Sequence, residues 1–218
     1  MPFKLFTNGY KNILLRKLGL CALFAISMAY LESAVVVYLR AIYYPSGFNL
    51  PMADILPFHL WTETGREAVT LIMLIIVSRL ASANRREWFA FFSFNFAMWD
   101  IWYYIWLKIL LNWPASLFDW DILFLIPVPW AGPVLAPILV SIALIFSALI
   151  ILIREGREKP VRMTRTGWLL ESAAGLIIIG SFCLNKGVPD AYPWWLFALG
   201  MLVGTGVFAR YAFQVKKS

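Results

Sequence analysis

The chain has 218 residues, of which 61% are hydrophobic and only 14% charged, against roughly 25% charged in an ordinary soluble domain. Its net charge of +7 comes from basic residues at the ends of apolar runs, a distribution that excludes a nucleic-acid partner and is typical of membrane topology signals. Several of these runs reach the roughly 20 residues that a hydrocarbon core of about 30 Å requires. The sequence therefore predicts an all-α, polytopic membrane bundle, with residues 1–218 forming a single transmembrane domain.

Six apolar segments make up most of the chain. We expect transmembrane helices near residues 14–42, 58–83, 88–111, 134–153, 167–184 and 194–213. A cleaved signal peptide is the alternative for the first segment, because residues 27–29 form a small-x-small site, and cleavage there would leave five spans. The apolar pattern continues through residues 35–37, which favours six spans. Pro57 is well placed to begin the second helix.

The stretch 112–133 interrupts this pattern. It is too apolar for a solvated loop and carries too many prolines for a spanning helix. We expect a short interfacial or re-entrant helix near 115–125, followed by an extended Pro-Val-Pro segment. Irregular backbone at membrane depth is tolerated only against protein or water, so the segment 113–132 is predicted to fold back over the bundle.

The distribution of basic residues predicts the orientation of the bundle. All but four of the 19 Lys and Arg residues fall on the side of the two termini; the exceptions are Arg40, Arg66, Lys108 and Lys186. By the positive-inside rule, both termini are predicted to be cytoplasmic. The loops 43–57, 112–133 and 185–193 then face outward.

The stretch 58–70 opens the second apolar segment, yet it contains the only histidine of the chain, two glutamates and an arginine. At about 100° per residue, His59, Glu63 and Glu67 fall on one face of a helix, and Arg66 lies inside the same stripe. Such a face cannot point at lipid. It therefore predicts polar partners on neighbouring helices.

Acidic residues on three consecutive segments share one depth. At 1.5 Å per residue, Glu32 lies roughly 15 Å, Glu67 about 13 Å and Asp100 roughly 16 Å from the outer end of its segment. Ionisable groups inside a membrane are costly and indicate a functional site by default. We therefore expect these three acids to form a deep site, because short turns make the first three helices neighbours.

The remaining candidate residues surround this deep site. Glu63 and His59 are expected to line its entrance, and Arg66 to balance its charge. Asp121 lies in the loop that is expected to cover its mouth. The full set of predicted ligand- or ion-binding residues is Glu32, His59, Glu63, Arg66, Glu67, Asp100 and Asp121.

The chemistry of this cluster stays open at the level of sequence. Four embedded acids and one arginine cannot all be ionised and unpaired. A divalent metal is one solution, with His59, Glu63 and Glu67 as its ligands. A proton relay is the second, and a static network of salt bridges the third. No motif for any other cofactor stands in the chain, and its single histidine argues against a dinuclear iron site.

Two further patterns concern packing. Gly200 and Gly204 form a Gly-x-x-x-Gly motif, which is typical of helices that pack closely. The third segment carries Trp, Tyr and Phe at high density, which indicates packing and interfacial residues more than a pigment or quinone pocket.

The middle third of the chain resembles a group of uncharacterised bacterial multi-pass membrane proteins. The resemblance rests on residues 99–104 (Trp-Asp-Ile-Trp-Tyr-Tyr), 113–114 (Trp-Pro), 121–127 (Asp-Ile-Leu-Phe-Leu-Ile-Pro) and 129–134 (Pro-Trp-Ala-Gly-Pro-Val). No activity and no site residues come with it. It implies a bacterial source and a location in the cell inner membrane.

The leading functional prediction is a membrane protein that binds a cation, a proton or a small polar ligand in an outward-opening cavity, with transport or proton transfer as its use. A metal-dependent intramembrane enzyme acting on a lipid or quinone-like substrate is one alternative. An accessory subunit of a larger membrane complex is the other. Membrane lipids are the expected partners, and a homo-oligomer or a larger complex stays open.

Overall fold

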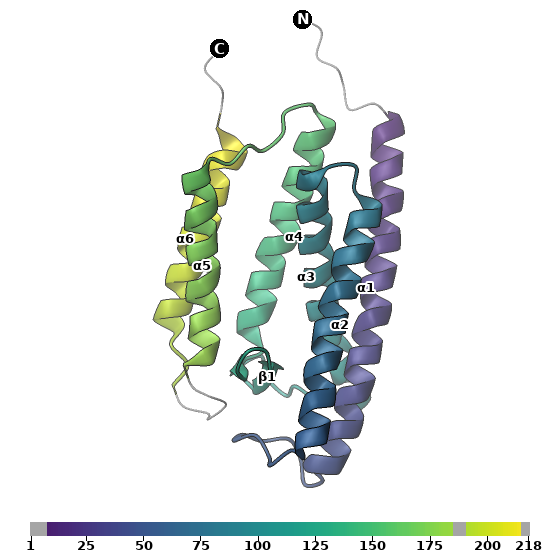
Figure 1. Cartoon of the computed structure of the whole chain (residues 1–218), viewed down its shortest axis with the longest axis vertical. Helices are drawn as coiled ribbons and strands as arrows, with labels where there is room; N and C mark the ends of the chain where they lie inside the picture. Colours follow the sequence, from purple (N-terminus) through teal and green to yellow (C-terminus); the bar gives the residue numbers. More distant parts are fainter. Residues whose placement is uncertain (1–7, 185–190, 215–218) are drawn as a thin grey trace, which may run out of the picture.

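The computed structural model describes residues 8–184 and 191–214. Within these ranges the chain forms helices that run up and down a common axis, with a small β-hairpin near one end of the bundle (Figure 1). The helices are α1 (Asn8–Tyr43), α2 (Pro57–Ala81), α3 (Arg85–Leu111), α4 (Leu135–Gly156), α5 (Arg165–Cys183) and α6 (Trp194–Phe213). Each of the six predicted segments is therefore helical.

Four of the helices in the described ranges are long and apolar enough to cross a membrane, namely α1, α4, α5 and α6. The other two helices are long enough but less apolar: α2 carries Glu63, Arg66 and Glu67 close together, and α3 combines Asp100 with several Trp and Tyr side chains. The fold is thus all-helical apart from the hairpin, and its apolar helices fit a membrane protein.

Local signals explain where the helices begin and end. Pro57 is the first residue of α2, where its fixed φ suits a helix and its missing N–H costs nothing. Asn84 caps α3, because its side-chain oxygen accepts hydrogen bonds from the backbone N–H groups of Arg86 and Glu87. Asn112 ends α3 with a left-handed backbone (φ 52°), a conformation that asparagine tolerates better than most residues.

The stretch between α3 and α4 is a β-hairpin, so the helix predicted near 115–125 is wrong. Strand β1 (Trp120–Phe124) pairs antiparallel with β2 (Trp130–Pro133), and Asp121 lies opposite Gly132. Ahead of β1, the carboxylate of Asp119 accepts hydrogen bonds from the backbone N–H groups of Ala115 and Ser116, which fixes a turn where a helix was expected.

The helices pack as two groups, α1–α4 and α5–α6, which meet at α4 and at the hairpin. Helices α1, α2 and α3 are mutual neighbours, as their short connections predicted, and α4 packs along α3. Helices α5 and α6 form a separate pair (Figure 1). This pair touches the rest of the bundle through α4 and through the hairpin, where the rings of Trp130 and Phe182 stack. An edge contact between the rings of Phe89 on α3 and Trp168 on α5 also joins the two groups.

Glycines hold α5 and α6 close together, which confirms the packing role predicted for the Gly-x-x-x-Gly motif. A Cβ atom on Gly200 would lie 2.6 Å from Cγ1 of Ile178 and 3.0 Å from the carbonyl oxygen of Ala174. On Gly204 it would make ordinary contact with the Ala174 side chain at 3.5 Å.

Gly200→Ala is expected to destabilise the protein by about 1–3 kcal/mol, because the added methyl group forces α5 and α6 apart. The free energy of unfolding in detergent measures this. Gly206→Ala on the same helix is the matched control, since an added Cβ there meets nothing within 4 Å. Equal stabilities of the two variants would contradict the close packing at Gly200.

Candidate functional site

Arg66 of α2 joins two acidic side chains. It forms salt bridges with Glu32 of α1 and with Glu63 one turn earlier on α2, where Nη2 lies 2.7 Å from Oε2. The second oxygen of Glu32 accepts a hydrogen bond from the Thr70 hydroxyl at 3.2 Å. Both glutamates are buried, so one guanidinium serves two embedded carboxylates. Arg66 therefore pairs with two of the acids whose charge it was expected to balance.

The other two embedded acids accept hydrogen bonds from no cation among the described residues. Glu67 of α2 accepts hydrogen bonds from the backbone N–H of Leu125, at 2.9 Å and 3.1 Å to its two oxygens. Asp100 of α3 accepts one from the hydroxyl of Ser141 on α4, at 2.8 Å. Glu67 thus attaches the hairpin to α2, and Asp100 attaches α4 to α3.

A small cavity brings these groups together. It has a volume of about 50 Å³ and is lined by Glu32, Arg66, Glu67 and Asp100, along with aromatic rings of α3 and residues of β1. A polar cavity needs roughly 10–15 Å³ to hold one water molecule. The cavity therefore has room for a few waters and for no organic molecule. The three acids expected at a common depth do surround one space.

Asp121 lies beside this cavity and is paired with Arg40 of α1. Nη2 of Arg40 is 3.1 Å from Oδ1 of Asp121, and the Tyr103 hydroxyl donates to Oδ2 at 3.4 Å. The guanidinium also lies over the rings of Phe48 and Trp113, 4.1 Å and 3.8 Å from their centroids. Burial raises the pKa of the Asp121 carboxyl, and the charge of Arg40 opposes that rise.

His59 belongs to a different contact. Its Nδ1 lies 2.5 Å from the hydroxyl of Tyr43 at the end of α1, and the same hydroxyl accepts a hydrogen bond from the backbone N–H of Leu56. Across the described part of the chain, no three His, Cys, Asp or Glu side chains are grouped to hold a metal ion. The structure therefore does not bring His59 together with Glu63 and Glu67 as a ligand set, and the metal assignment stays a prediction from sequence.

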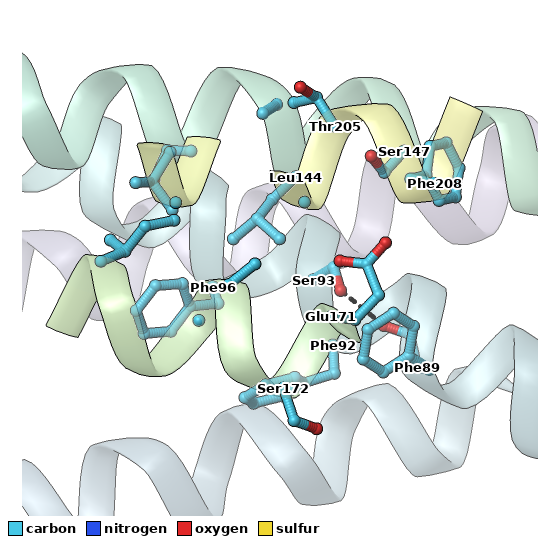
Figure 2. Close-up of a pocket in the computed structure, with 18 of the residues that line it drawn as sticks. Phe89, Phe92, Ser93, Phe96, Leu144, Ser147, Glu171, Ser172, Thr205 and Phe208 are labelled. Atoms are coloured by element: carbon cyan, nitrogen blue, oxygen red, sulfur yellow. Dashed lines mark hydrogen bonds between the residues drawn. The ribbon is translucent and has the colours of Figure 1, made fainter. Parts of the chain in front are cut away.

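A large cleft separates α3 and α4 from α5 and α6. Its volume is about 1340 Å³, and aromatic and aliphatic side chains of all four helices line it (Figure 2). A few polar groups interrupt this lining, among them Ser93, Ser147, Glu171 and Thr205 (Figure 2). Sequence reasoning missed the cleft. The signal that the sequence offered was Glu171, an acid within an apolar segment, for which a structural role near Arg165 was the favoured interpretation.

Glu171 of α5 is unlike the other embedded acids. Its Oε1 atom is buried and accepts no hydrogen bond from the described residues. The nearby hydroxyls of Ser93 and Thr205 donate instead to carbonyl oxygens of their own helices. A buried polar atom without a partner costs about 1–3 kcal/mol, so Glu171 marks a place where the cleft lacks a hydrogen-bond donor.

Asp100 lines both spaces. It borders the small polar cavity on one side and the large apolar cleft on the other, with Leu123 of β1 beside it in both linings. Asp100 therefore lies between a cavity large enough for water and a space that opens among apolar helices. This position sets Asp100 apart from Glu32 and Glu67, which line the cavity alone.

No protein-family model, curated protein or solved structure matches this chain. The resemblance of residues 99–134 to bacterial membrane proteins accordingly stays a prediction.

Proposed function

We propose that this protein transfers protons through its buried carboxylate network, with Asp100 as the group that takes up and releases the proton. The observation that carries the proposal is the polar cavity shared by Glu32, Glu67, Asp100 and Arg66. Embedded carboxylates that face a water-filled space are the usual components of proton pathways in membranes.

The distribution of charge favours Asp100 for this role. Arg66 neutralises at most one of its two partners, Glu32 and Glu63. Glu67 is stabilised by a backbone N–H group, whereas the hydrogen-bond partner of Asp100 among the described residues is a neutral hydroxyl. An unpaired carboxylate at this depth costs several kcal/mol, so Asp100 is the carboxyl that gains most from holding a proton.

The size of the cavity favours protons or small ions over organic ligands. A volume of about 50 Å³ accommodates water and excludes organic solutes. Of the carboxylates that line it, Glu32 is already engaged by Arg66, whereas Glu67 and Asp100 accept hydrogen bonds from neutral groups.

The proposal includes a topology of six spans in a bacterial inner membrane with both termini in the cytoplasm. Helix α2 has 25 residues, which corresponds to about 38 Å and exceeds a hydrocarbon core of about 30 Å. Its buried acids pair within the protein instead of facing lipid. The first residues of α1 and the last of α6 lie at the same end of the bundle (Figure 1).

The test is proton flux into liposomes that contain the purified protein, followed with an internal pH dye at an imposed potential. Asp100→Asn and Glu67→Gln are each expected to lower the flux by about 100-fold, the lower end of what a positioned acid or base contributes. Both amides keep a hydrogen-bond acceptor for Ser141 or Leu125, so the fold should persist. Circular dichroism and monodispersity in detergent check this.

Glu171→Gln is the matched control, because it alters a carboxyl of the cleft that does not line the polar cavity. It is expected to leave the flux unchanged. Wild-type flux no higher than that of empty liposomes, or full flux in Asp100→Asn, would overturn the proposal and leave a static salt-bridge network.

An enzyme acting on a lipid or quinone-like substrate is the second candidate, and the position of Asp100 on the cleft wall favours it. Asp100 would then exchange its proton with a molecule in the cleft. Filling the cleft separates the two candidates: Gly175→Phe would abolish such an enzyme and leave proton flux intact, because Gly175 lines only the cleft.

A further inference from the structure

We infer that the cleft between α3–α4 and α5–α6 binds one anionic lysophospholipid, with its phosphate at Arg85 and Arg162, its glycerol hydroxyl at Glu171 and its single chain along the apolar wall. This inference goes beyond proton transfer, since it concerns a different space and different residues. It rests on the shape of the cleft, on the charges at one end and on the unpartnered oxygen of Glu171.

The cleft has the length and the lining of a site for an acyl chain. It extends along α3 from Arg85 to Asp100, which is fifteen residues or about 22 Å. Phe92 and Phe96 of α3, Leu144 of α4 and Phe208 of α6 form much of its wall (Figure 2). A cleft of about 1340 Å³ exceeds the roughly 300–1,000 Å³ of pockets for drug-sized ligands, so it suits a lipid.

Positive charge gathers at one end of this cleft. Arg85 and Arg86 at the start of α3 and Arg162 just before α5 all line it. Glu155 holds Arg86 through two hydrogen bonds of 2.9 Å and 2.7 Å, which occupies that guanidinium. Arg85 and Arg162 are exposed and form no ion pair within the described residues. Arginine matches the geometry of phosphate, so these two side chains suit a lipid phosphate at the membrane surface.

Glu171 requires a donor from the ligand. It lies six residues after the start of α5, about 9 Å further into the bundle than the basic end. The Glu171 side chain lines the cleft (Figure 2), and its buried Oε1 atom has no hydrogen-bond partner in the described structure. The free glycerol hydroxyl of a lysophospholipid lies just beyond the phosphate and donates a hydrogen bond. A diacyl phospholipid has an ester at that position and cannot donate.

The test measures binding of 1-oleoyl-lysophosphatidylglycerol to the full chain in a non-ionic detergent, by native mass spectrometry and by titration. One molecule per chain is expected. The double variant Arg85→Gln/Arg162→Gln is expected to bind about 25-fold more weakly, at about fivefold per arginine. Arg210→Gln is its matched control, because Arg210 is an exposed arginine at the same end of the bundle and does not line the cleft.

A second pair of variants tests the site by volume. A Cβ atom added to Gly175 or to Gly180 on α5 meets nothing within 4 Å, but only Gly175 lines the cleft. Gly175→Phe is expected to abolish lipid binding, and Gly180→Phe to retain it. Because neither change touches the polar cavity, proton flux is the independent readout that separates failure of this inference from failure of the proposed function.

The choice of lipid completes the test. Dioleoyl-phosphatidylglycerol is expected to bind at least tenfold more weakly than the lyso form, and Glu171→Leu is expected to erase that difference. Lysophosphatidylcholine distinguishes anionic from zwitterionic heads, and sodium phosphate alone distinguishes a lipid site from an ion site. Equal binding by the two Phe variants, equal binding by the two arginine variants, or saturation by phosphate alone would overturn the inference.

Discussion

Arg66→Met is expected to destabilise the protein by about 3–5 kcal/mol, because it leaves two buried carboxylates without their cation. Glu32 and Glu63 each have only 8% of their side-chain surface exposed, and Arg66 itself is 22% exposed. Methionine keeps most of the side-chain volume, so the loss reflects charge and not a cavity. Equilibrium unfolding in mixed micelles measures it, and the variant is expected to insert poorly at 37 °C.

Replacing the two unpaired carboxylates with amides is expected to restore much of this stability. The triple variant Arg66→Met/Glu32→Gln/Glu63→Gln is expected to recover at least half of the loss, because neutral amides need no cation. Arg79→Met, at the other end of α2, is the matched control, since the Arg79 side chain is exposed and, in the described part of the chain, donates hydrogen bonds to Ser82. If Arg66→Met were no less stable than Arg79→Met, the salt bridges of Arg66 would contribute nothing to the free energy of unfolding.

Arg40→Met is expected to produce the other large effect, a loss of about 3–5 kcal/mol that is concentrated in the hairpin. Both partners of the Arg40–Asp121 pair are nearly inaccessible, with 9% and 3% of their side chains exposed. The guanidinium also packs on Phe48 and Trp113, so its loss loosens the loops on both sides. Hydrogen exchange across residues 112–133 measures this, with at least tenfold faster exchange expected in β1.

Asp121→Asn in the same chain is expected to rescue part of that loss, since it removes the uncompensated charge. Lys108→Met is the matched control, because Lys108 is a cation of α3 whose hydrogen bonds to described residues go to the exposed carbonyl oxygens of Asn112 and Pro114. Unchanged exchange in Arg40→Met would show that strand pairing alone holds the hairpin.

Local patterns in the sequence predicted the helices well. Runs of about 20 apolar residues have few alternatives to a helix, because a lipid environment leaves backbone groups no other partners. The predicted start of the second helix differs from Pro57 by one residue. The third begins at Arg85, three residues before the apolar run, because the Asn84 cap and not hydrophobicity sets its first turn.

The hairpin was beyond such reasoning. Its strands are held by pairing between residues 120–124 and 130–133, and the position of each strand depends on that partner. The apolar residues of the stretch suggested a helix, whereas its prolines and the Asp119 turn decide against one. Because a helix was expected over this stretch, the direction of the Asp121 side chain could not be predicted. Its pairing with Arg40 was therefore not predicted either.

Of the candidate site, the sequence predicted the depth of the acids but not their partners. Counting residues from the ends of the segments predicted a common depth for Glu32, Glu67 and Asp100, and depth depends only on helix rise. The partners of these acids depend on how each helix is rotated about its axis. The Leu125 N–H and the Ser141 hydroxyl were therefore unpredictable, as was the cleft that exposes Asp100 and leaves Glu171 without a donor.

The hairpin contacts both the polar cavity and the apolar cleft. On one side, Glu67 holds it through the Leu125 N–H group, and Leu123 closes the polar cavity. On the other, Leu123, Phe124 and Trp130 form part of the cleft wall. By linkage, whatever change protonation of the cavity makes in the affinity of the cleft for a ligand equals the change that the ligand makes in proton affinity. Leu123 and Asp100, which line both spaces, are the residues through which such a change would pass.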